Sequence, residues 1–412
     1  MKMIHCITGL VLGAFAATLH AQSVPLPTAA PSAAQQAGID KDNSRHFGDS
    51  PADGGPIATG LSSELTAAAI DKATRKVADW QLARSQPYFD RIWTWSVLYS
   101  GFMAASQSTG DPKYRDAMAA MASGFHFQLR NRVPSADDQS IAQTYLELYL
   151  LAGKKDPKTI APTKADLDSV IGLATLKPGD ARIPWWWCDA LFMAPPVWAR
   201  MYAATGDRRY IDYLDGQWQR SSALLYDKEE HLYARDASFI GKPGLNGKKI
   251  FWSRGEGWVM GGLVRTLEYL PADDPRRSFY VNQLREMSAR LAQLQGSDGL
   301  WNASLLDPEH FPQPEISGSA LIVYGMAWGV NEGTLDAKTY KPILERAWRG
   351  MLQHVYADGR LGDIQQTGSE PSRYRPTASY TYGVGGYLLA ASELKRMTTL
   401  SPAARKTDTP RK

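Results

Sequence analysis

Apolar residues recur along most of the chain with the spacing of amphipathic helices. Two stripes follow the i, i+4, i+7, i+8 pattern: Ile141, Tyr145, Leu148 and Tyr149, and Val259, Leu263, Thr266 and Leu267. No convincing alternating pattern bounded by strand-type turns competes with them. The helical pattern begins near residue 61 and continues to about 398. We therefore predict an all-α chain over this region.

A short sequence repeats at two junctions between helical stretches. Residues 109–114 read Thr-Gly-Asp-Pro-Lys-Tyr, and residues 205–210 read Thr-Gly-Asp-Arg-Arg-Tyr. In each copy the glycine can end one helix in the left-handed conformation, the aspartate can cap the next helix, and the tyrosine faces the core one turn later. Residues 152–156 and 333–336 are looser versions. Helices joined this tightly pack as antiparallel neighbours, so we predict helical hairpins closed into one α/α toroid with a concave centre.

The two ends of the chain differ from this helical region. Residues 1–21 are typical of a secretory signal peptide, with a basic start and an apolar run too short to span a bilayer. Residues 22–60, rich in Ala, Pro, Ser, Gly and Asp, are predicted to be a flexible lead-in. Residues 399–412 are predicted to be a disordered tail. The folded domain is therefore expected at 61–398, in an exported protein, periplasmic or secreted, without a membrane anchor.

Composition excludes several classes of function. The 46 basic and 42 acidic residues are spread along the 412-residue chain, which predicts neither a nucleic-acid patch nor a membrane-surface helix. Removal of the leader would leave Cys188 as the only thiol, so no intramolecular disulfide is possible. The 7 histidines show no metal-ligand spacing. We therefore expect no metal and no cofactor, and the oligomeric state is not indicated.

The most unusual segment surrounds Asp189. This aspartate is the only acidic residue between Arg182 and Pro196, follows three consecutive tryptophans, and lies in a stretch whose prolines forbid one uninterrupted helix. Apolar surroundings disfavour the charged form of a carboxyl and so raise its pKa, as a proton-donating acid requires. Asp189 could instead cap the helix ahead of Pro195 or pair with Arg182. The residues alone leave the catalytic and structural interpretations equally open.

A second acidic site is the pair Asp137 and Asp138, which precedes a helix through Gln143 and Tyr145. One interpretation is a helix cap, worth about 1 kcal/mol. The other is a carboxylate at the mouth of a helix, pointing at the central cavity from the loop end of the ring. Both can hold at once, and the sequence does not choose between the two aspartates.

A third cluster, residues 252–258, reads Trp-Ser-Arg-Gly-Glu-Gly-Trp and opens a helix expected to begin near Val259. Its glycines would allow close approach of a ligand, Arg254 could hold a carboxylate in a forked pair, and its tryptophans could stack on a sugar. A helix start alone gives no reason for so much glycine, so we favour a functional interpretation.

Aromatic residues are abundant, with 13 tryptophans and 19 tyrosines. Flat aromatic faces suit the C–H faces of sugar rings, although filling the core is the simpler explanation for any one of them. Tryptophans within the clusters around Asp189 and Arg254 are the better candidates for sugar binding, namely Trp185, Trp187, Trp252 and Trp258.

Together the three clusters resemble glycoside hydrolase family 105, the unsaturated rhamnogalacturonyl hydrolases, and more distantly the unsaturated glucuronyl hydrolases of family 88. The resemblance runs along nearly the whole helical region. Its motifs are Asp-Asp-x4-Gln-Thr-Tyr (137–145), Trp-Cys-Asp-Ala-Leu-Phe-Met-Ala-Pro-Pro (187–196), Arg-Gly-x-Gly-Trp-Val (254–259), Ser-Gly-Ser-Ala (317–320), Tyr-Gly-Met-Ala-Trp-Gly (324–329) and Tyr-Gly-Val-Gly-Gly-Tyr-Leu-Leu-Ala (382–390).

The resemblance implies an (α/α)6 barrel and a substrate made by a polysaccharide lyase, which leaves a terminal uronic acid with a C4–C5 double bond. In such enzymes an aspartate, here Asp189 by motif, protonates C4 and helps water attack C5, after which the ring opens and the neighbouring sugar leaves. This differs from direct attack at the anomeric carbon. Asp137 or Asp138 would position the water or a ring hydroxyl. Arg254 and Trp258 resemble substrate contacts.

The resemblance leaves the polysaccharide open. A rhamnogalacturonan or other pectic substrate is favoured, with ulvan and rhamnose-capped arabinogalactan as alternatives. Further candidate contacts are Gln143, Trp185, Trp187 and Trp252. Glu256 stands where many relatives carry Asn, and an extra negative charge beside an anionic sugar would weaken binding unless it meets a compensating neighbour.

Two other functions remain possible from the sequence. One is an inverting glycosidase acting on saturated oligosaccharides, with Asp189 as acid and the Asp137–Asp138 site as base. The other is an exported carbohydrate-binding protein that kept the ring and lost catalysis. An acid retained among tryptophans argues against the second, because binding alone does not need it.

Overall fold

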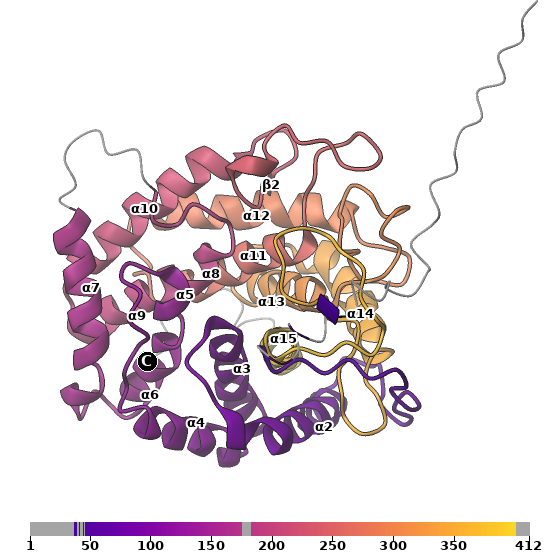
Figure 1. Cartoon of the computed structure of the whole chain (residues 1–412), viewed down its shortest axis with the longest axis horizontal. Coiled ribbons are helices and arrows are strands. Elements are labelled where there is room, and N and C mark those ends of the chain that lie inside the picture. The colour runs from indigo at the N-terminus through magenta and orange to yellow at the C-terminus, as the bar shows by residue number, and fades with distance from the viewer. Residues whose placement is uncertain (1–36, 39–40, 42–43, 45, 175–182, 401–412) are drawn as a thin grey trace, which may run out of the picture.

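The computed structural model describes residues 37–38, 41, 44, 46–174 and 183–400, and its helices form two concentric rings (Figure 1). The inner ring consists of α3 (Trp93–Thr109), α6 (Ala142–Leu151), α9 (Pro195–Thr205), α11 (Ser253–Leu267), α13 (Ile316–Asn331) and α15 (Thr381–Thr399). The outer ring consists of α2 (Ala67–Ser85), α4 (Pro112–Gly124), α7 (Ala161–Ala174), α10 (Arg209–Leu225), α12 (Arg277–Gln293) and α14 (Ala337–Leu352). This is the predicted (α/α)6 barrel.

Shorter elements lie in the connections between the two rings. They are the helices α5 (Ala136–Gln139) and α8 (Ala190–Met193), the 3-10 turns η1 (Gln86–Tyr88), η2 (Pro157–Thr159) and η3 (Ala237–Phe239), and the strands β1 (Tyr226–Asp227) and β2 (Leu232–Tyr233). The two strands pair antiparallel, with Tyr226 opposite Tyr233.

Helices divide between the two rings according to their polarity. Every residue of α13 is buried, as expected for an apolar helix surrounded by others. Glycines let the inner helices approach closely: a Cβ built on Gly101 of α3 would lie 2.7 Å from the Cα of Gly385 in α15. Outer helices such as α14 instead bury one face and expose charged residues on the other. The core therefore lies between the rings and through the barrel centre.

The repeated junction predicted from the sequence is confirmed. Gly110 ends α3 with φ 70° and Gly206 ends α9 with φ 76°, both left-handed. The side chain of Asp111 accepts from the amide of Lys113 at 3.2 Å, as an N-cap does. Tyrosines buried one turn later join adjacent outer helices through hydroxyl-to-carboxylate bonds: Tyr114 to Asp79 at 2.5 Å, Tyr210 to Asp168 at 2.8 Å and, at the next junction, Tyr280 to Asp215 at 3.0 Å.

The ends of the chain require one correction. The predicted signal peptide lies outside the described residues, as does the tail from residue 401. Residues 46–58, assigned to the flexible lead-in, instead pack on the barrel. Asp49 exchanges backbone hydrogen bonds with Ser379 at 2.9 and 2.7 Å, and the amide of Ala58 donates to Val355 at 2.8 Å. Among the described residues, no helix is both long and apolar enough to cross a bilayer.

Topology sets the location of the three sequence clusters. Inner and outer helices alternate along the chain, so every inner helix begins at the same end of the barrel (Figure 1). Asp137 precedes α6, Asp189 precedes α9, and residues 252–258 begin α11. The alternation therefore brings all three clusters to one mouth of the ring.

Candidate active site

The segments ahead of the inner helices enclose a cavity of about 230 Å³. It is lined by His46, Trp93, Asp137, Trp187, Asp189, Met193, Arg235, Thr367 and Gly368. Asp189 and Asp137 therefore face the same space, as the sequence predicted, with Trp187 beside them. The sequence did not single out His46, Trp93, Arg235 or the 367–368 segment.

Asp189 occupies a shielded position at this cavity. Its side chain is 13% exposed, and the nearest cation is the Nε of Arg235, 3.6 Å from Oδ2. Burial raises the pKa of Asp189, and the charges of Arg235 and Arg254 offset only part of that effect. The capping alternative is not observed, because no side-chain cap bond forms at the start of α8. Arg182, the other proposed partner, lies outside the described residues.

The adjacent aspartates Asp137 and Asp138 have different environments. Asp137 lines the cavity, and burial, followed by the negative charge of Asp189, raises its pKa to about 6. Asp138 is 2% exposed and accepts at 3.0 Å from both the amide and the Nε of Arg132, outside the cavity lining. Neither aspartate caps the helix, since Ser135 does so through the amide of Asp138 at 3.4 Å. Of the two, Asp137 is thus the aspartate that shares the cavity with Asp189.

Arg235 is the main residue that sequence analysis missed. Its Nη1 pairs with Asp236 at 2.7 Å, and its guanidinium carbon lies 5.7 Å from the ring of Trp186. The segment reaches the site because the amide of Cys188 donates to the carbonyl of Arg235 at 2.8 Å. Arg235 lies just after a two-residue strand and in no motif that we recognised, so no sequence signal pointed to it.

Trp186 gives the cavity an exposed aromatic neighbour. It is 50% exposed, and its ring centroid lies 4.8 Å from that of Trp187, which lines the cavity. Exposed aromatic rings beside a polar cavity are suited to packing against a sugar face. The three consecutive tryptophans therefore differ in environment, because Trp185 is buried, with its ring centroid 6.0 Å from that of Tyr213, and does not line the cavity.

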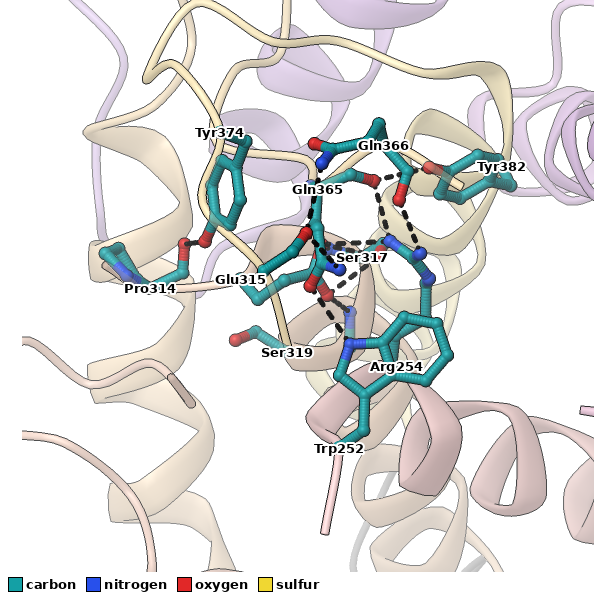
Figure 2. A network of polar contacts seen from close by, with 12 residues as sticks. Trp252, Arg254, Pro314, Glu315, Ser317, Ser319, Gln365, Gln366, Tyr374 and Tyr382 are labelled. Carbon is teal, nitrogen blue, oxygen red and sulfur yellow. Dashed lines mark hydrogen bonds and ion pairs between the residues drawn. The ribbon is translucent and has the colours of Figure 1, made fainter. Parts of the chain in front are cut away.

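Arg254 does not lie on the cavity wall, contrary to its expected contact with substrate. It is 1% exposed, and its two terminal nitrogens donate to the carbonyls of Gln365 and Gln366, each at 2.7 Å (Figure 2). Glu315, whose Oε1 lies 3.8 Å from Nη1, holds the same segment by accepting from the amide of Gln365 at 3.1 Å. Arg254 therefore anchors the chain just ahead of the cavity-lining residues 367–368.

Three other residues that were predicted to contact the substrate are also buried. Trp258 is 1% exposed and packs edge-on against Trp93, with ring centroids 5.9 Å apart. Trp252 is 2% exposed and donates from Nε1 to the side chain of Gln365 at 3.0 Å. Gln143 is 1% exposed and bonds within the core. None of these three side chains lines the cavity, and their contacts lie behind its lining residues.

The glycines of the third cluster serve packing between helices. The helix α11 begins at Ser253, six residues earlier than expected, so the cluster forms its first turns. A Cβ on Gly257 would lie 3.0 Å from the carbonyl oxygen of Gly318, and one on Gly255 would lie 3.0 Å from the sulfur of Cys188. Small residues at these positions let α13 and the Asp189 segment approach α11. This packing explains the glycines of the cluster, for which the sequence alone offered no structural reason.

Glu256 meets a neighbour that the sequence did not reveal. It is fully buried, and its carboxyl accepts from the amide of Tyr233 at 3.0 and 3.1 Å. Burial raises its pKa well above the usual range, so the neutral form is favoured. It is not part of the cavity lining, so its carboxyl makes no direct contact with a sugar bound there.

Two carboxyls in one aromatic-walled cavity, at the mouth of an (α/α)6 barrel, form an arrangement suited to a glycosidase. Sequence comparison agrees: the model of Glycosyl Hydrolase Family 88 matches residues 64–398, and the chain belongs to this family. The resemblance inferred from the motifs is thereby confirmed.

Characterised relatives and solved structures fit this assignment. The chain is 36% identical over 345 residues to an unsaturated 3S-rhamnoglycuronyl hydrolase of Formosa agariphila, covering 80% of this chain and 91% of the relative. It is 32% identical over 361 residues to a protein of the same name from Alteromonas sp., covering 81% and 86%. A family 88 structure from Bacteroides vulgatus superposes with a TM-score of 0.75 at 30% identity, covering 81% of this chain and 99% of that one.

Proposed function

We propose that the protein removes a terminal 4,5-unsaturated uronic acid from oligosaccharides left by polysaccharide lyases. The observation that carries this proposal is the shared cavity of Asp189 and Asp137 in a family 88 barrel. The names of the two curated relatives, both unsaturated rhamnoglycuronyl hydrolases, support the same reaction. We also propose export, on the sequence of residues 1–21 alone.

Asp189 acts as the proton donor in this mechanism. Burial raises its pKa, so its carboxyl keeps a proton at a pH where an exposed aspartate has lost it. The proton passes to C4 of the double bond, and positive charge develops at C5 and the ring oxygen. Water then adds at C5 while the Asp189 carboxylate takes one of its protons, which restores the acid.

The product of this addition is a hemiketal at C5, which collapses without further help. The bond between C5 and the ring oxygen breaks, C5 becomes a ketone, and the hemiacetal left at C1 releases the neighbouring sugar as an alcohol. Asp137 lies in the same cavity and positions the water or a ring hydroxyl. Arg235, 3.6 Å from Asp189, supplies the positive charge that an anionic substrate needs.

The sugar beyond the cleaved bond is proposed to be rhamnose, the sugar in the names of both curated relatives. Trp186, half exposed beside the cavity, offers a platform for that sugar. The rhamnogalacturonan-type substrate expected from the motifs shares this rhamnose and stays a prediction.

A substrate panel tests the proposal. Unsaturated uronyl-rhamnose disaccharides, with and without a 3-O-sulfate on the rhamnose, are incubated with the enzyme, and loss of the ene-carboxylate ultraviolet absorbance is followed. We expect loss of absorbance together with release of rhamnose or its sulfate. Equal cleavage of the saturated disaccharides would favour an inverting glycosidase and contradict the proposal. Binding of the panel without turnover would favour a carbohydrate-binding protein.

A further inference from the structure

The turn that carries Asp189 has a gap in its backbone hydrogen bonding. In a continuous helix the carbonyl of Phe192 would accept from the amide of residue 196. Residue 196 is proline, which has no N–H, and the preceding Pro195 has none either. The helix accordingly breaks between α8 and α9, and the carbonyl of Phe192 faces the core without a helical donor.

Gln143, from the neighbouring inner helix α6, supplies the missing donor. Its Nε2 donates to the carbonyl of Phe192 at 2.8 Å and lies 3.5 Å from the carbonyl of Met193. The side chain is 1% exposed, so water does not compete for these bonds. Met193 lines the cavity beside Asp189, and the ring of Phe192 packs against Trp258 at 5.1 Å. One amide group therefore fixes the segment that carries the acid.

Gln143 is itself held in a single orientation. Its Oε1 accepts from the Nε of Arg265 at 2.6 Å, and Arg265, on α11, also pairs with Glu147 at 3.3 Å. Because arginine can only donate, the amide oxygen must face it and the NH2 group must face the carbonyls. The chain thus fixes which end of the glutamine meets the Asp189 turn.

We propose that Gln143 is a positioning residue for the reaction: it replaces the amide that Pro196 lacks and so holds the turn bearing Asp189 at the cavity. This role rests on the proposed function of Asp189 and replaces the substrate contact expected for Gln143 from its motif. Misplacing a reacting group by about 1 Å lowers a rate by on the order of 100-fold, so one fixed turn can have a large effect.

Two substitutions at this position separate the donor from the rest of the side chain. Gln143→Glu keeps the shape and the bond to Arg265 but loses the donor, and Gln143→Met removes both polar groups without adding charge. Gln295 provides a matched control: its Nε2 donates to the carbonyls of Gly299 and Ile343 at 2.8 and 2.9 Å, and its Oε1 accepts from Arg346 at 3.1 Å. Gln295 follows α12 and does not line the cavity.

The kinetic readout is kcat and KM on an unsaturated disaccharide for both pairs of variants. We expect Gln143→Glu and Gln143→Met to lower kcat roughly 10- to 100-fold with KM changed less than threefold. Gln295→Glu and Gln295→Met should stay within twofold of the original enzyme. Equal losses at both positions would reduce the effect to general stability and overturn the proposal. A rise in KM alone would overturn it too, because that result indicates a substrate contact.

A second readout does not depend on turnover. Hydrogen–deuterium exchange of residues 188–198 should quicken at least tenfold in both Gln143 variants and remain unchanged in both Gln295 variants. Unchanged exchange in the Gln143 variants would contradict the positioning role even if the enzyme proved inactive on every unsaturated sugar. Inactivity of the original chain on the panel would instead count against the proposed function, so the two failures are distinguishable.

Discussion

At the scale of single residues, the site depends on two carboxyls that share one cavity but are 52 residues apart in the sequence. The pKa of Asp137 is raised to about 6, first by burial and then by Asp189. Burial is the largest cause of the raised pKa at both carboxyls, and at Asp189 the charges of Arg235 and Arg254 offset part of it. Raised pKa values keep a protonated acid in the cavity. They also lower the free energy of unfolding at a pH above them, because the buried carboxyls must then ionise.

This conflict predicts a pH-dependent stability of the variant Asp137→Asn. The pKa of Asp137 is near 3.8 in the unfolded chain and about 6 in the folded one. Its contribution to the free energy of unfolding is therefore fully present below pH 3.8 and is lost as the pH rises through about 6. The variant cannot ionise, so its free energy of unfolding should exceed that of the original chain by up to about 3 kcal/mol at pH 8 and by only about half as much at pH 5, which lies between the two pKa values. Urea unfolding at both pH values measures this, and an equal gain at both would contradict the raised pKa.

The sequence predicted some residues of the site and missed others for identifiable reasons. Asp189 stood out because an acid among apolar residues has few structural explanations, and Asp137 because it precedes a helix at the loop end of the ring. Arg235 could not be found, since it reaches the cavity through a backbone hydrogen bond to Cys188, and His46 could not be found because it belongs to a segment with little apolar pattern. Arg254 belongs to a recognised motif, yet its bonds to Gln365 and Gln366 are visible only in the structure.

At the scale of elements, the close packing of α11 against α13 determines the position of the cavity wall. A Cβ on Gly318 would lie 2.5 Å from the carbonyl carbon of Ser253 and 2.7 Å from the amide nitrogen of Arg254. Both contacts are with backbone, which cannot move aside as a flexible side chain can. The position of Arg254, and hence of the segment that it holds, depends on this contact.

The variant Gly318→Ala should therefore be destabilised by about 1–3 kcal/mol, because the added methyl group forces α11 and α13 apart. Gly216, inside α10, is the control: a Cβ there meets nothing within 4 Å, so Gly216→Ala should stabilise the chain by up to about 1 kcal/mol. Thermal unfolding of both variants checks the pair. A Gly318→Ala variant as stable as the original chain would show that the two helices can separate freely.

Helix positions were easier to predict than helix starts. The glycine–aspartate junctions gave the ends of α3 and α9, because a left-handed residue followed by a cap is encoded locally. The start of α11 at Ser253 was missed, since its glycines disfavour a helix on their own. Their contacts with α13 and Cys188 outweigh that preference, and such contacts lie outside any local window of sequence.

At the scale of the whole molecule, the barrel is closed by segments from both ends of the chain. The α15 helix packs between α3 and α13 at the centre (Figure 1). Residues 46–58 then run over the barrel, and Arg84 holds them by donating to the carbonyls of Phe47 and Gly48 at 3.2 and 3.0 Å. The alternation of helices could be predicted from periodicity, whereas the docking of a segment with so little apolar pattern could not.

This docked segment should contribute to activity as well as to stability. A chain beginning at Leu61 loses His46 from the cavity and the pairing of Asp49 with Ser379. We expect its melting temperature to fall by several degrees and kcat/KM to fall about tenfold or more. The variant His46→Ala, measured beside it, should reproduce part of the kinetic loss with little change in melting temperature. Full activity of the shortened chain would remove residues 46–58 from the site.

The central claim is that Asp189 delivers the proton, and the turnover of Asp189→Asn tests it most directly. Asparagine keeps the shape but has no acidic proton, so the rate of ultraviolet absorbance loss should fall at least about 1000-fold, with the substrate still bound. Asp215→Asn, the same substitution on the outer ring, should retain the original rate. Turnover by Asp189→Asn within tenfold of the original enzyme would contradict the account.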